Sequence, residues 1–262
     1  MTETTALDTA HAAMLADPQN DAARLRFFER LADSELFLML TEEAVGENIS
    51  PEVFDVADGR FVLAFDREER LARFAGRPVP YVALSGRVLS GMLAGQGIGL
   101  GLNLETAPSS MLVPAEALGW LAETLQHGPE EVEEKLAEFM PPAGLPDSLL
   151  TALDAKLATA GGLASAAYLV ATKSEAGAQG HLLGFVGAIE GAEPALAKAA
   201  SEALTFSGIE AGAMDVGFFA TDDVAAALLA KTGLRFDLPE PQVADQVREV
   251  PGSNPAKPPI LK

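Results

Sequence analysis

The turn Ser85-Gly86-Arg87 has the clearest capacity for chemistry, because it follows an apolar stretch and precedes a helical pattern. Free amides at a helix start, the Ser85 hydroxyl and the Arg87 guanidinium could together hold a carboxylate or a phosphate. Tyr81 and Asn103 could line the same end of the sheet. The alternative, which we favour, is an ordinary Ser85 N-cap with a solvated Arg87, since serine is among the commonest N-caps.

Other residue types that carry catalysis or bind metals are scarce or scattered. The three histidines, His11, His127 and His181, do not have a metal-ligand spacing, and cysteine is absent. Five glutamates between residues 130 and 138 surround a predicted helix that also carries Lys135, which indicates a solvated, ion-paired face. We therefore expect no metal site, no cofactor and no catalytic residue set.

The glycines at 95, 97, 99 and 101 suggest a nucleotide-binding loop, but their context argues against one. Phosphate-binding loops run from a strand into a helix, whereas these glycines run from a predicted helix into a predicted strand. Close packing against the glycine face of the strand at residues 98–102 explains them better.

The charge of −20, from 38 acidic and 18 basic residues, bears on partners and location. Such a field repels nucleic acids and anionic membranes and favours basic partners, although solubility is the simpler explanation. No apolar stretch approaches the ~20 residues that span a bilayer, and residues 1–4 lack the features of a secretion signal. We expect a cytoplasmic protein whose oligomeric state stays open.

Hydrophobic periodicity and turn signals predict an α/β (α+β) protein of two small domains, each a mixed β-sheet packed with helices. The first domain covers residues 1–127, with Asp66 and Glu69 as a capping box for the helix that follows them. An acidic helix and linker occupy residues 128–144, and the second domain covers residues 145–238 in the order α-β-β-α-β-α. Residues 239–262 form a Pro-rich tail.

The order of motifs between residues 28 and 103 resembles the SseB family of bacterial proteins, named for enhanced serine sensitivity. The motifs are Ser34-Glu35-Leu36-Phe37, Val62-Leu63-Ala64-Phe65, Glu68-Glu69-Arg70-Leu71, the segment 80–87 and the segment 97–103. The resemblance implies an SseB-like N-terminal domain followed by an SseB-like C-terminal domain. It further implies a bacterial cytoplasmic protein with a non-enzymatic role, and its name suggests a link to serine metabolism.

Three hypotheses for function follow. The first is a non-catalytic interaction or regulatory protein that binds another protein. The second is a binder of a small anionic metabolite at the Ser85–Arg87 turn. The third is an enzyme that uses carboxylates alone, which would need two acidic residues that converge in a cleft with displaced pKa values.

Overall fold

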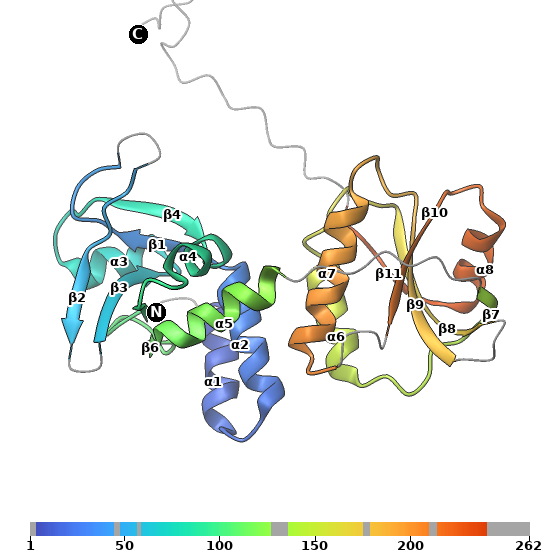
Figure 1. The fold of residues 1–262 in the computed structure, drawn as a ribbon, viewed down its shortest axis with the longest axis horizontal. Helices are drawn as coiled ribbons and strands as arrows, with labels where there is room; N and C mark the ends of the chain where they lie inside the picture. The colour runs from blue at the N-terminus through green and yellow to red at the C-terminus, as the bar shows by residue number, and fades with distance from the viewer. Residues whose placement is uncertain are drawn as a thin grey trace, which may run out of the picture.

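The computed structural model describes residues 4–44, 48–56, 59–126, 136–174, 179–209 and 214–239, and in that part of the chain it contains two mixed sheets. Figure 1 shows the two sheets, each with its own helices, as two domains side by side. The predicted fold class, two small α/β domains, is confirmed. The predicted Pro-rich tail lies outside the described residues from 240 onward.

The first domain has one six-stranded sheet in the order β4-β1-β3-β5-β6, with β2 also paired to β3. Strands β3 and β5 are parallel, and the other pairs are antiparallel. Its elements are α1 (Ala6–Ala16), α2 (Asp21–Asp33), β1 (Glu35–Met39), β2 (Val53–Val56), β3 (Gly59–Phe65), α3 (Glu68–Ala75), β4 (Tyr81–Ser85), α4 (Gly86–Leu93), β5 (Ile98–Leu102), β6 (Met111–Val113) and α5 (Ala115–Gln126).

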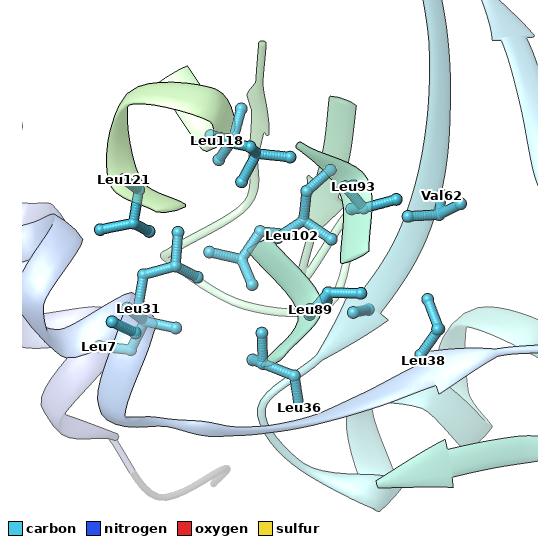
Figure 2. Close-up of a cluster of buried hydrophobic side chains, with 14 of the residues drawn as sticks. Leu7, Leu31, Leu36, Leu38, Val62, Leu89, Leu93, Leu102, Leu118 and Leu121 are labelled. Carbon is cyan, nitrogen blue, oxygen red and sulfur yellow. The ribbon is translucent and has the colours of Figure 1, made fainter. Parts of the chain in front are cut away.

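Alternation along the strands gives this sheet two apolar faces. Leu36 and Leu38 of β1 and Leu102 of β5 point into the core beneath α1, α2, α4 and α5, as Figure 2 shows. The intervening side chains, such as Phe65, pack with α3 on the other face. On β5 that second face carries Gly99 and Gly101. A Cβ on Gly99 would lie 2.6 Å from the Val113 carbonyl oxygen, so the predicted close packing is confirmed for this strand.

The second domain has a five-stranded sheet in the order β10-β9-β8-β11, with β7 also paired to β8. Helices α6 and α7 cover one face and the shorter α8 covers the other. In Figure 1, α6 and α7 lie on the side toward the first domain, and α8 lies on the far side. The elements are β7 (Leu136–Met140), α6 (Asp147–Leu157), β8 (Ala166–Ser174), β9 (Gln179–Val186), α7 (Glu193–Phe206), β10 (Asp215–Phe219), α8 (Val224–Thr232) and β11 (Leu234–Phe236).

The predicted acidic helix at residues 128–140 is wrong for its last five residues, which form strand β7. Phe139 pairs with Thr172 and Met140 with Ala171 of β8, so backbone pairing to an existing strand decides the conformation. Residues 127–135 lie outside the described part. Strand β11 was also not predicted, and it pairs with β8 beyond the region that β7 occupies.

Among the described helices, none has the length and hydropathy that crossing a bilayer requires.

Candidate functional site

The strand–turn–helix predicted around Ser85 is present, and Ser85 is the N-cap of α4. Its side-chain oxygen accepts a hydrogen bond from the Val88 amide at 3.3 Å. The Gly86 amide donates to the Ser34 carbonyl at 2.9 Å, and a methyl group on Gly86 would overlap the Leu31 carbonyl. The turn is therefore packed tightly against the end of α2, and the glycine is required by that close approach.

Arg87 pairs with carboxylates of this chain. Its Nη1 lies 2.6 Å from Oε1 of Glu202 and its Nη2 lies 2.9 Å from Oε2, which makes a two-point ion pair. Nη2 also lies 3.2 Å from Oδ1 of Asp33. The hydrogen bonds to Glu202 raise the pKa of Arg87, although burial opposes the rise. The anion site at Ser85–Arg87 stays a prediction. The Arg87 guanidinium, which an anion would need, already pairs with Glu202 and Asp33.

Tyr81 and Asn103 lie apart from each other. Because β4 and β5 run in the same direction, Ser85 and Asn103 lie at the carboxyl ends of their strands, whereas Tyr81 begins β4 at the opposite end. The Tyr81 hydroxyl is exposed, and a hydrogen bond with Glu68 raises its pKa. Asn103 is buried with a φ of 49°, and its side chain accepts from the Asp66 amide at 3.0 Å. Tyr81 therefore lies away from the Ser85–Arg87 turn, whereas Asn103 lies at the same end of the sheet, with β1 and β3 between β4 and β5.

A buried ion network joins the start of α1 to α3. Arg70 lies 2.5 Å from Oδ2 of Asp8 and 2.8 Å from Oδ1 of Asp66, and the side chains of all three are almost fully buried. Ser109 donates from its hydroxyl to Asp8 at 2.6 Å, and Thr5 forms a capping box with Asp8. Burial alone would raise the pKa of Asp8, but hydrogen bonds from Arg70, Ser109 and Thr5 hold it well below its ordinary value.

The predicted capping box at Asp66 and Glu69 is wrong. Arg67 is the N-cap of α3, and no side-chain oxygen caps this helix. The Asp66 carboxylate instead accepts from Arg70 and from the Thr5 hydroxyl at 2.7 Å. The Asp66 carboxylate therefore binds a guanidinium of α3 and the hydroxyl of the α1 N-cap, and it does not cap α3.

A second group of charges lies between the domains, and we call it the interdomain cluster. It consists of Glu29 and Asp33 of α2, Arg87 of α4, Lys156 of α6 and Glu202 of α7. The ammonium of Lys156 lies 2.6 Å from Asp33, 3.1 Å from Glu202 and 3.9 Å from Glu29. Hydrogen bonds from Arg87 and the charges of Arg87 and Lys156 lower the pKa of Glu202, although burial alone would raise it.

Sequence reasoning missed this cluster, because it singled out only Arg87. A usable signal was present. Lys156 and Glu202 interrupt the apolar faces of helices whose neighbouring residues, Leu153 and Ala203, are fully buried. A lone charge on an apolar helical face is almost never buried without a partner.

An aromatic contact accompanies the ion pairs across the domain interface. Phe206, at the end of α7, is 2% exposed and belongs to the core of the first domain. Its ring lies 6.5 Å from that of Trp120 on α5, and Trp120 in turn lies 5.3 Å from Phe28 on α2. The two domains thus share both charged and apolar contacts.

Two of the histidines lie within the described part of the chain, and each has a local environment that the structure defines. His11 is buried beside Phe27, and burial lowers its pKa. The ring of His181 lies 3.1 Å from the Ala143 carbonyl oxygen, and His127 lies outside the described residues. Within the described ranges, no group of three or more Asp, Glu or His side chains could hold a metal ion.

A cavity of about 400 Å³ opens between the starts of α1 and α3. Its walls include Ser34, Phe37 and Arg67, together with the acidic residues Glu35, Asp66, Glu68 and Glu69. Ser85 and Arg87 do not line it. An excess of carboxylates around the cavity disfavours a bound anion.

The comparison with protein families gives one result. Residues 7–120 match the family model described as the SseB protein N-terminal domain. Neither the search of curated proteins nor the search of solved structures found a significant match. The matched range begins in α1 and ends within α5, so it covers the first domain and stops before the second sheet.

Proposed function

We propose, from the premise that the first domain is an SseB N-terminal domain, that this protein is a non-catalytic module that binds another protein. The bacterial cytoplasmic location, the link to serine metabolism and the SseB-like nature of the second domain belong to the same proposal. The use of the buried charged groups supports a non-catalytic role. Asp8, Arg87 and Glu202, whose pKa values are displaced, are paired with oppositely charged groups of the same chain.

The observation that carries the proposal is the outer face of α8. Apart from Lys231 and Thr232, this helix consists of Val, Ala and Leu. Ala226 and Leu229 are buried against the sheet, whereas Val224 and Leu228 are 79% and 47% exposed. A helix that is apolar all round is normally covered on both sides. The outer face of α8 is therefore a surface suited to a protein partner.

The charges beside this face indicate the chemistry of the partner. Asp222 and Asp223 are exposed directly before α8, and the chain as a whole carries a charge of −20. A partner with an apolar patch bordered by lysine or arginine would match both features, because rim charges of opposite sign speed the encounter. We propose such a basic protein as the partner.

The test uses the full chain as bait for chemical crosslinking in cell extract, followed by mass spectrometry. The double variant Val224→Gln and Leu228→Gln should reduce recovery of the partner at least tenfold. Each apolar side chain contributes about 1.5–3 kcal/mol when it is fully buried. Both positions are exposed, so the melting temperature should stay close to that of the wild type.

Leu15→Gln is the matched control, because Leu15 is 61% exposed on α1 in the other domain. It should leave recovery unchanged. Equal recovery by the wild type and both variants would remove the assignment of the binding face to α8. Failure to crosslink any protein specifically to the wild type would count against the interaction function itself. A partner that makes or degrades serine would support the metabolic link.

A further inference from the structure

Glu29 is the member of the interdomain cluster whose partners are incomplete. It lies on α2, is 1% exposed, and its Oε1 has no hydrogen-bond partner. The nearest cation of the cluster, the ammonium of Lys156, is 3.9 Å from that oxygen and sits closer to Asp33 and Glu202. A buried carboxylate without a hydrogen bond is costly, whereas a protonated carboxyl is much less so.

The charges of the cluster balance only when one carboxyl is neutral. Glu29, Asp33 and Glu202 supply three carboxyl groups, and Arg87 and Lys156 supply two cations. Asp33 and Glu202 each contact both cations, which leaves Glu29 as the odd member. An ionised Glu29 therefore adds a carboxylate for which the cluster has no cation to spare.

The groups that face Glu29 shift its pKa in opposite directions. Burial raises the pKa of Glu29 from its ordinary value of 4.5, and the charge of Asp33 adds to the rise. Lys156, Arg30 and Arg26 oppose the rise without cancelling it. Arg26 also donates to the Ser148 carbonyl of the second domain at 3.2 Å.

We propose that Glu29 makes the contact between the two domains depend on pH, so that the contact is closed when this carboxyl is protonated and loosens when it is ionised. The carboxyl and Lys156 belong to opposite domains, so separation of the domains would let water reach the ionised group. Small, polar contacts between domains are the kind that can open. The apolar contact of Phe206 acts in the opposite direction and keeps the opening partial.

The sign follows from proton linkage. The closed form binds the Glu29 proton more tightly than the open form, so closure is favoured at low pH and is lost as pH rises through the raised pKa. Between the ordinary value of 4.5 and the raised value, the open population should increase up to about tenfold for each pH unit. At still lower pH, protonation of Glu202, whose pKa is lowered, weakens its ion pairs with Arg87 and Lys156, so closure passes through a maximum.

The experiment measures the distance between the domains in the full chain. The chain lacks cysteine, so Leu15→Cys on α1 and Ile189→Cys after β9 give two exposed sites for spin labels. Pulsed electron paramagnetic resonance between pH 4 and 9 should show a longer or broader distance distribution as pH rises. Glu29→Gln, which stays neutral, should keep the short distance over the upper part of this range.

Glu116→Gln is the control, because it removes an exposed glutamate of α5 and should retain the wild-type response. Identical pH responses in the wild type and the Glu29→Gln variant would overturn the proposal. If Glu29→Gln does not fold, the wild-type titration still decides, since an unchanged distance from pH 5 to 9 would also overturn it.

Discussion

Arg87 on α4 and Glu202 on α7 form a two-point ion pair that joins the two domains, with N–O distances of 2.6 and 2.9 Å. Glu202 is nearly buried, so its carboxylate depends on cations of the cluster. Arg87 also binds Asp33. A guanidinium held in this way positions α4 against α7, so Arg87 has a structural role within the chain.

Arg87→Ala should lower the free energy of unfolding by about 1–3 kcal/mol. This loss is smaller than that expected for a fully buried ion pair, because Arg87 is 34% exposed and Lys156 still pairs with Glu202. Urea unfolding at pH 7 measures the change. Arg235→Ala, which removes an exposed pair with Asp237, should change stability by less than about 0.5 kcal/mol. Equal effects of the two variants would contradict a structural role for Arg87.

Phe206→Ala should destabilise the first domain although Phe206 belongs to a helix of the second. Removing a fully buried phenylalanine costs about 3–5 kcal/mol, because a cavity remains. Hydrogen exchange should therefore speed up in β1 and β3. Phe218→Ala, at a position 36% exposed on β10, should have a smaller effect that stays within the second domain. Unchanged protection of β1 and β3 in the Phe206 variant would mean that the domains are independent.

Local patterns predicted much of the fold because they depend on neighbouring residues. The strand that leads into the turn at Ser85, the Ser85 cap and the glycine face of β5 all follow from short segments of sequence. The interdomain cluster does not, because Arg87 and Glu202 are 115 positions apart and no local spacing links them.

Strand β7 shows a different limit of sequence reasoning. Its apolar residues Leu136, Phe139 and Met140 fit a helical period, and only pairing with β8 makes them a strand. Likewise, the assignment of Asp66 as a cap failed because a charged partner, Arg70, competes for its carboxylate.

Asp8→Asn should lower the free energy of unfolding at pH 7 by about 3 kcal/mol, because it removes the charge of a buried carboxylate that pairs with the buried Arg70. The pKa of Asp8 is held below its ordinary value of 3.8, so its stabilising contribution is present above that pH and is lost as pH falls toward the lowered pKa. The difference between wild type and variant should therefore shrink below about pH 4.

Urea unfolding between pH 2 and 7 tests this expectation for Asp8. Asp21→Asn, which removes an exposed pair with Arg24, should change stability by less than about 0.5 kcal/mol at every pH. A constant difference between the wild type and the Asp8 variant across the pH range would show that packing, and not ionisation, accounts for the loss.

Gly86→Ala and Gly91→Ala place the same methyl group at two positions of α4 with opposite expected results. At Gly86 the methyl group would overlap the Leu31 carbonyl, so α4 must move away from α2 and the free energy of unfolding should fall by about 1–3 kcal/mol. At Gly91 no atom lies within 4 Å of the added Cβ, and alanine is the better helix former, so stability should rise by about 0.5–1 kcal/mol. Thermal unfolding of both variants measures the two shifts. Helix propensity favours alanine at both positions, so only the close approach of α2 can make one substitution destabilising and the other stabilising. A stabilised Gly86→Ala variant would show that the turn at Ser85 is not packed as described.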